Sequence, residues 1–312
     1  MIFNMFMGEG GASGFPEFDY TGQFQLIDDG KQDRVQNWRI KFLTSGVLTF
    51  KKLKGSVDAF LVGAGGGGAP NSAEKGYSAG GGGGYVNTVS GILPAVGEPL
   101  EIVIGSGVTG ARGGTTTAFG ASAEGGYPGN NYTGGDGGSG GGCGAGHSSD
   151  SYSGAGGVDG GDGETKSVGN GGTGSQQTTR EFATSTTKAY IVGSTAFASD
   201  WLSDAEDGSA LSPVQGTIYS VMTEGDYQYH DYLWDGTAFK ETDLARLYSG
   251  GGWGGQQPAM NIAPALADIT ARTLRNTNGK ANTGAGGGGD PLFESSTNTA
   301  GGSGIVIIRN AR

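Results

Sequence analysis

Residues 134–142 read Gly-Gly-Asp-Gly-Gly-Ser-Gly-Gly-Gly, and glycine again recurs at every third position from Gly154 to Gly163. A period of three requires a helix with three residues per turn, and the polyproline II conformation has this geometry without internal hydrogen bonds. Two glycines in every three positions leave two ridges of such a helix without side chains. Neighbouring helices can then touch backbone to backbone, so the stretch predicts a bundle of glycine-rich polyglycine II helices.

The glycine bias extends over most of the chain. Sixty-eight of the 312 residues are glycine, and further clusters occur at 65–68, at 80–84, at 250–255 around Trp253, and at 286–289. A flexible linker is the competing interpretation, because segments rich in glycine and serine usually remain coil. Aromatic and β-branched residues such as Tyr85 lie between the runs, and they favour ordered packing with backbone groups paired between helices.

Composition and charge narrow the class of protein. The net charge of −11 argues against binding of nucleic acid or an anionic membrane through a basic surface. The single cysteine, Cys143, excludes an internal disulfide framework. The segment Met1–Ser13 has no basic residue before its apolar cluster, and no apolar run approaches the length of a membrane span. We therefore expect neither membrane insertion nor export by a standard signal peptide.

Strands are predicted near both ends of the chain. The final apolar run, Gly304–Arg309, is typical of a strand buried on both faces. We expect it to pair with the early strands, so that the glycine-rich segments project from a shared sheet. The early strands are predicted at Gly22–Ile27, Trp38–Phe42, Val47–Lys51, Val57–Val62, Tyr85–Val89 and Leu100–Ile104.

The region 188–242 loses the glycine bias and is strongly acidic. Between Glu181 and Ala245 there are eleven acidic residues and two lysines, which gives −9 of the total −11. A short helix is predicted after Ser194, and another at Pro264–Arg275. Strands are predicted at Thr217–Met222, Tyr227–Trp234 and Ala238–Lys240, the last two joined by a hairpin turn at Asp235-Gly236.

These patterns together predict a mainly β fold with a polyglycine II helix bundle and a small inserted α+β domain. Residues 1–20 form an N-terminal segment in this interpretation. The β and glycine-rich domain comprises residues 21–180 and 248–312, and the acidic α+β module at 188–242 is inserted into it.

Motifs of enzymes occur, but composition explains them. Gly63–Gly68 fits G-x-G-x-x-G, yet neither a helix nor a ribose-binding carboxylate follows. Ser139 fits G-x-S-x-G without the strand and helix of a nucleophile elbow. The only imidazoles are those of His147 and His230, and aspartates such as Asp136 lack the regular spacing of calcium-binding repeats. We predict no catalytic residue, no metal ligand, no cofactor and no enzymatic activity.

Aromatic and amide side chains between the glycine runs are the candidates for binding. Tyrosine, asparagine, serine and glycine are typical of adaptable recognition loops, and aromatic rings with amide neighbours also suit sugar rings. The alternative is that the rings seal glycine layers, which have no side chains of their own to exclude water. Both interpretations stay open for Tyr127, Asn130, Asn131, Tyr132, Tyr152 and Trp253.

The order of the motifs resembles the glycine-rich domain of bacteriophage tail proteins. Relatives in that family include the adhesins at the tips of long tail fibres, in which polyglycine II helices form a sandwich with host-reading loops at the far end. The matching pieces are Phe42–Phe50, Val57–Gly68, Gly80–Val86, Leu100–Gly105, Gly113–Gly120 and Gly301–Arg309.

The resemblance implies a phage virion protein, namely a tail-fibre or tail-tip adhesin that binds the host surface. It would be made in the host cytoplasm and incorporated into the tail. Its partners would be a bacterial surface glycan or outer-surface protein and other virion proteins. The alternative is a structural capsid or tail decoration protein whose acidic insert meets the partner. A homo-oligomer stays open, since no coiled-coil heptads are present to enforce one.

Overall fold

Strands dominate the protein, as the sequence predicts. Among the described residues there is no α-helix, and the only helical turn is the 3-10 turn η1 at Glu181–Ala183. The computed structural model describes residues 15–27, 38–69, 78–130, 132–144, 154–156, 163, 179–183, 189–191, 218–222, 229–234, 236–241, 247–248, 251, 278–289 and 299–311.

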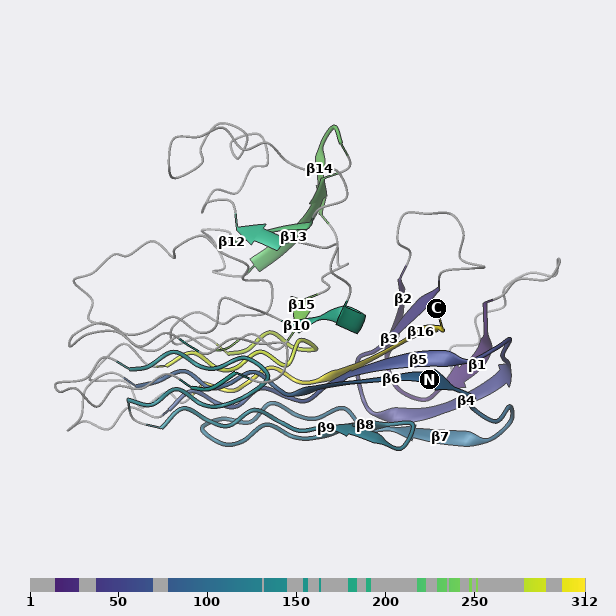
Figure 1. Cartoon of the computed structure of the whole chain (residues 1–312), viewed down its shortest axis with the longest axis horizontal. Helices are drawn as coiled ribbons and strands as arrows, with labels where there is room; N and C mark the ends of the chain where they lie inside the picture. The colour runs from purple at the N-terminus through teal and green to yellow at the C-terminus, as the bar shows by residue number, and fades with distance from the viewer. Residues whose placement is uncertain are drawn as a thin grey trace.

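A five-stranded antiparallel sheet is built around the C-terminal strand. Its order is β2 (Phe24–Ile27), β3 (Arg39–Phe42), β16 (Ile305–Asn310), β5 (Val57–Val62) and β6 (Val86–Ile92). The prediction that the last strand pairs with the early strands is confirmed. Figure 1 shows β16, in yellow, beside β3 and β5.

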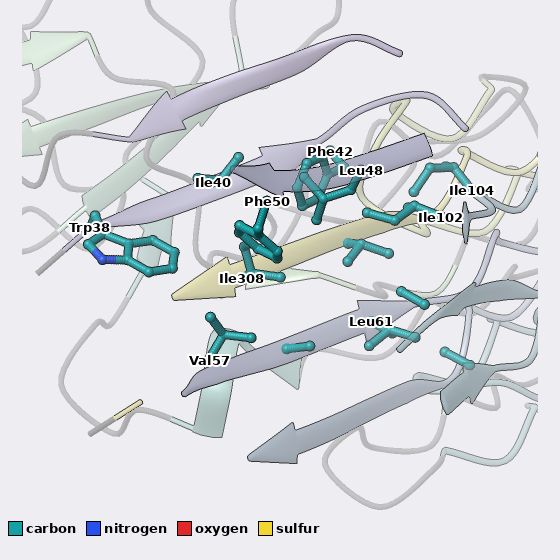
Figure 2. Close-up of a cluster of buried hydrophobic side chains, with 14 residues drawn as sticks. Trp38, Ile40, Phe42, Leu48, Phe50, Val57, Leu61, Ile102, Ile104 and Ile308 are labelled. Atoms are coloured by element: carbon teal, nitrogen blue, oxygen red, sulfur yellow. The ribbon is translucent and has the colours of Figure 1, made fainter. Parts of the chain in front are cut away.

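A second sheet covers one face of the first. Its three strands are β1 (Glu17–Tyr20), β4 (Gly46–Lys52) and β7 (Pro99–Ile102), again all antiparallel. Figure 2 shows the side chains that meet between the two sheets, among them Phe42, Phe50 and Ile308. Each large side chain that is fully buried in this way stabilises the fold by about 1.5–3 kcal/mol. This cluster is the main hydrophobic core of the described chain.

The opposite face of the five-stranded sheet is buried as well. Phe60, Val62, Ile305 and Ile307 pack there against Phe182 and Tyr248. Tyr248 belongs to a short antiparallel pair formed by β10 (Thr179–Arg180) and β15 (Leu247–Tyr248), and Phe182 lies in η1, which directly follows β10. Burial on both faces explains why the C-terminal strand reads as a continuous apolar run.

The hairpin of β8 (Thr116–Ala118) and β9 (Ala121–Ala123) was not predicted. Its two-residue turn consists of Phe119 and Gly120, which have φ angles of 52° and 73°. Positive φ at both positions is the signature of a type I′ turn, which usually carries asparagine or aspartate followed by glycine. Because phenylalanine rarely adopts the left-handed backbone conformation, the sequence gives no signal for this turn.

The glycine-rich segments run side by side and are held together by backbone hydrogen bonds, in a pattern that repeats every three residues. Successive N–H groups of residues 63–69 point to three different neighbouring segments, with donor–acceptor distances of 2.9–3.2 Å. Residues 63, 66 and 69 donate to the carbonyls of residues 85, 82 and 79 in one neighbouring segment. Residues 64 and 67 donate to the carbonyls of residues 114 and 111 in a second segment. Residues 65 and 68 donate to the carbonyls of residues 302 and 299 in a third segment.

Backbones approach so closely in these segments that a side chain does not fit. A Cβ atom on Gly66 would lie 2.1 Å from the carbonyl oxygen of Tyr127, and one on Gly82 would lie 2.2 Å from that of Asp136. Such contacts are far inside van der Waals distance, and the clashing atoms belong to the backbone. Glycine is therefore required at these positions by packing.

Segments that lead away from the strands alternate with segments that return. Residues 63–69 follow β5, and residues 79–85 precede β6. Residues 124–129 follow β9, and residues 134–138 run antiparallel to them and pair with them. In Figure 1 these segments extend to the left of the large sheets. The turn between Asn130 and Thr133 consequently lies at the end of its segments that is remote from the strands.

A separate four-stranded sheet occurs in the acidic region. Its order is β11 (Ala189–Ile191), β12 (Ile218–Met222), β13 (Tyr229–Trp234) and β14 (Phe239–Glu241), with only the first pair parallel. The predicted strands and the β13–β14 hairpin are confirmed, and Gly236 in the turn has a φ of 101°. The helices predicted after Ser194 and at Pro264–Arg275 lie outside the described residues.

Candidate functional site

Exposure along residues 124–130 follows the same period of three. Glu124, Tyr127 and Asn130 are exposed, whereas the glycines between them are buried and Pro128 is half-buried. Three side chains of different chemistry, a carboxylate, a phenol and an amide, therefore line one side of a single segment. We call Glu124, Tyr127 and Asn130 the Tyr127 ridge.

Backbone bonds fix the ridge from both sides. The N–H of Tyr127 donates to the carbonyl of Asp136 at 2.7 Å, and its carbonyl accepts from the N–H of Gly82 at 3.0 Å. The N–H groups of Gly126 and Gly129 donate to a third segment, at Ala64 and Gly67. A partner that contacts the ridge would not need to order this backbone, which removes one cost of binding.

Arg112 covers one face of the Tyr127 ring. Its guanidinium carbon lies 4.2 Å from the ring centroid, its Nε donates to the carbonyl of Gly125 at 3.0 Å, and its Nη2 pairs with the Glu124 carboxylate. A cation over an exposed ring contributes about 0.5–1 kcal/mol. Tyr127 nevertheless remains 44% exposed, so much of the ring stays open to solvent.

Asp136 and Tyr85 are the polar neighbours of the ridge. The Oδ1 of Asp136 accepts a hydrogen bond from the N–H of Ala155 at 2.7 Å. The pKa of Tyr85 is raised, mainly by burial and then by the charge of Asp136, with Arg112 acting in the opposite direction. The Tyr85 hydroxyl is thus protonated at neutral pH and able to donate a hydrogen bond.

The structure brings part of the predicted binding set together. Tyr127 and Asn130 share the ridge, and half-buried Tyr132 lies on the turn that follows. This turn is closed by two backbone bonds of 2.8 Å between Asn130 and Thr133. Asn131, Tyr152 and Trp253 lie outside the described residues.

Sequence reasoning missed three charged members of this site. Glu124 could have been found, because it precedes Tyr127 by three residues, the same spacing that separates Tyr127 from Asn130. Asp136 lies within the glycine run that defines the period of three, but from the sequence alone it is considered only as a possible calcium ligand. Arg112 belongs to another segment, and only the packing of segments places it over the ring.

The enzyme-like motifs serve packing in this structure. The N–H groups of residues 63–68, which a pyrophosphate would require, donate instead to neighbouring segments. Ser139 is fully buried, and its carbonyl accepts from Gly83.

In the described parts of the chain, no group of three or more histidine, cysteine, aspartate or glutamate residues is placed to hold a metal ion. The same parts contain no helix with the length and apolar character needed to cross a membrane.

Comparison with known proteins identifies the family of the chain. No curated protein matches the chain significantly. A family described as a glycine-rich domain matches residues 43–311, well over half of the chain. This match spans the β-strands from β4 onward, the paired glycine segments and the Tyr127 ridge. The chain therefore belongs to the family of glycine-rich domains.

Proposed function

We propose that the chain is a bacteriophage virion protein, a tail-fibre or tail-tip adhesin that binds the bacterial host surface. The observation that carries the proposal is the Tyr127 ridge, an exposed aromatic and polar surface on a rigidly paired glycine scaffold. The family description names composition and no activity, so the assignment to phage rests on the order of the sequence motifs. The turn at Asn130–Thr133, remote from the strands, matches the far-end loops expected of such adhesins.

The glycine scaffold itself is proposed to be a bundle of polyglycine II helices. Hydrogen bonds that leave residues 63–69 in three directions in turn support this conformation, because it has three residues per turn and no bonds within a helix. Residues 80–85 repeat the pattern, with donors that alternate among carbonyls in 139–142, 284–287 and 124–127. The close contacts at Gly66 and Gly82 also agree with helices packed backbone to backbone.

The proposed mechanism is adsorption without chemistry. The protein would act in the virion tail after synthesis in the host cytoplasm, with a surface glycan or outer-surface protein as receptor and other virion proteins as its anchor. It would use no cofactor. Once one copy on a particle has bound, the other copies are held close to the host surface at a high effective concentration. The avidity of the whole particle would therefore exceed the affinity of one copy.

Binding to cells tests the adhesin proposal directly. Fluorescently labelled full-length protein is added to a panel of bacteria that includes the host of the parent phage, before and after enzymatic removal of surface glycans. We expect saturable binding to the host and to few other bacteria. Loss of binding after glycan removal would identify a sugar receptor, and persistence would identify a protein receptor. Absence of binding to the host would contradict the adhesin proposal.

One observation favours the second candidate, a structural decoration protein. In the short β10–β15 pair, the segment that precedes the acidic region pairs with the segment that follows it. This arrangement is expected of an inserted unit that has its own partner. Deletion of residues 188–242 separates the two functions. Adsorption should survive the deletion if the protein is an adhesin, whereas incorporation into the particle should fail if the acidic region is the attachment surface.

A further inference from the structure

We infer that the Tyr127 ridge binds an uncharged saccharide along the side of the glycine scaffold. The inference rests on the proposed adhesin function and specifies its ligand class and its position. The ridge follows the segment from the end of β9 to the turn at Asn130, so the site lies along the scaffold as well as at its remote end. At the polyglycine II rise of 3.1 Å per residue, successive ridge side chains are about 9 Å apart.

The charges around the ring exclude an anionic ligand. Among the described residues, Arg112 is the cation that contacts the Tyr127 ring, and its guanidinium is already held by the Glu124 carboxylate, the Gly125 carbonyl and the ring itself. Glu124 and Asp136 would repel a phosphate or carboxylate. An anionic sugar or a phosphorylated lipid headgroup would therefore meet repulsion, and the described part of the chain places no available cation beside the ring.

Hydrogen-bonding capacity at the ridge matches a ring that carries hydroxyl groups. Within the described part of the chain, no residue donates to the Oδ2 of Asp136 or to the Oε1 of Glu124. These carboxylate oxygens can accept from sugar hydroxyls, and the amide of Asn130 can both donate and accept. The open part of the Tyr127 ring offers an apolar surface to the C–H face of the sugar.

The ridge is also preorganised for such a ligand. Arg112 holds the Tyr127 ring by its stacking contact, and backbone bonds to Asp136 and Gly82 hold the chain beneath it. A shallow sugar site buries little surface, so burial contributes little binding free energy. Useful affinity therefore requires that few protein groups lose conformational freedom on binding.

A saccharide array tests the inference with the full-length protein. Immobilised neutral hexose oligosaccharides and N-acetylhexosamine oligosaccharides are compared with sialylated and phosphorylated versions of the same chains. Four variants accompany the wild-type protein: Tyr127→Ala, Tyr127→Phe, Asn130→Ala and Leu93→Ala. Leu93 is a matched control, because it is a large apolar side chain, 77% exposed, on a loop between β6 and β7. Thermal unfolding verifies that each variant is folded.

We expect the wild type to bind neutral saccharides and to discriminate against their anionic versions. Tyr127→Ala should weaken binding about tenfold and Asn130→Ala severalfold, while Tyr127→Phe and Leu93→Ala should bind like the wild type. Preference for anionic saccharides, absence of saccharide binding, or equal binding by folded Tyr127→Ala and the wild type would each overturn the inference.

Cell binding by the same proteins separates this inference from the adhesin proposal. If the wild type and Tyr127→Ala bind host cells equally, the adhesin proposal stands and the ridge inference fails. If the wild type binds neutral saccharides through Tyr127 but binds no host cells, the ridge inference stands and the adhesin proposal fails.

Discussion

Gly82 illustrates how tightly single positions are constrained in the glycine segments. Replacement by alanine would place a Cβ 2.2 Å from the carbonyl oxygen of Asp136, and a further backbone carbonyl lies at 2.6 Å. Neither contact can be relieved by a side-chain rotation, so the segments must separate. We expect Gly82→Ala to lower the free energy of unfolding by about 3 kcal/mol or more, as measured by urea denaturation.

Gly97 provides the control for this prediction. It has a φ of 87° with no atom within 4 Å of a built Cβ, so alanine there meets conformational strain without a clash. Gly97→Ala should therefore cost only about 1–2 kcal/mol. Equal losses for Gly82→Ala and Gly97→Ala would show that close backbone approach does not determine stability in the bundle.

Tyr20 predicts a dependence of stability on alkaline pH. Burial raises the pKa of Tyr20 from 10.0 to about 12, and its hydroxyl donates to the carbonyl of Thr44. The unfolded chain releases this proton at a lower pH than the folded protein does. The stabilisation that the protonated Tyr20 hydroxyl gives to the folded state is therefore complete below pH 10 and is lost between pH 10 and 12. Because the residue is partly exposed, the free energy of unfolding falls by less than about 1.4 kcal/mol per pH unit in this range.

Comparison with Tyr20→Phe isolates this effect from the other tyrosines. The stability difference between the wild type and Tyr20→Phe should shrink as the pH rises from 9 to 11, as followed by urea midpoints. A difference that stays constant over this range would contradict the raised pKa of Tyr20 in the folded state.

The ion pair of Arg39 and Glu181 ties the η1 turn, which precedes the acidic region in the sequence, to the central sheet. The Nη1 and Oε1 atoms lie 2.5 Å apart, and the two side chains are only 5% and 2% exposed. Removal of one partner from a buried pair typically costs 3–5 kcal/mol, whereas replacement of both by apolar residues can be nearly neutral. We expect Glu181→Ala to be strongly destabilising and the double variant Arg39→Met with Glu181→Leu to recover most of the loss in thermal unfolding. A double variant no more stable than Glu181→Ala would argue that the pair is not coupled.

Strands were predictable where the apolar pattern is strong. Val57–Val62 was predicted with the observed bounds, and the pairing of the C-terminal strand followed from its continuous apolar run. β1 was missed because its alternating residues, Glu17–Tyr20, lie outside every apolar run. The β8–β9 hairpin was missed because Phe119 occupies a position that normally carries asparagine or aspartate.

The site was predictable only in its aromatic and amide members. Tyr127 and Asn130 could be chosen by residue type and by their place between glycine runs. Arg112 reaches Tyr127 through the side-by-side packing of segments, and the sequence does not encode which segments become neighbours. A period of three gives the direction of each side chain around its own segment, but the order of segments in the bundle follows from many long-range backbone bonds.

Two deletions of different length test how the acidic region is joined to the remainder of the chain. Deletion of residues 188–242, with the ends joined by a short glycine-serine linker, keeps the β10–β15 pair and the cover formed by Phe182 and Tyr248. We expect its thermal midpoint to lie within a few degrees of the wild type.

Deletion of residues 179–248 removes that cover as well. Phe60 and Ile307, which are at most 1% exposed in the complete chain, would then face water. Loss of two buried aromatic side chains costs roughly 3–6 kcal/mol, and the uncovered apolar sheet face would promote aggregation. Light scattering and thermal unfolding of both proteins check the prediction. If the shorter deletion destabilises as much as the longer one, residues 188–242 contribute to the central core and are not a separate inserted module.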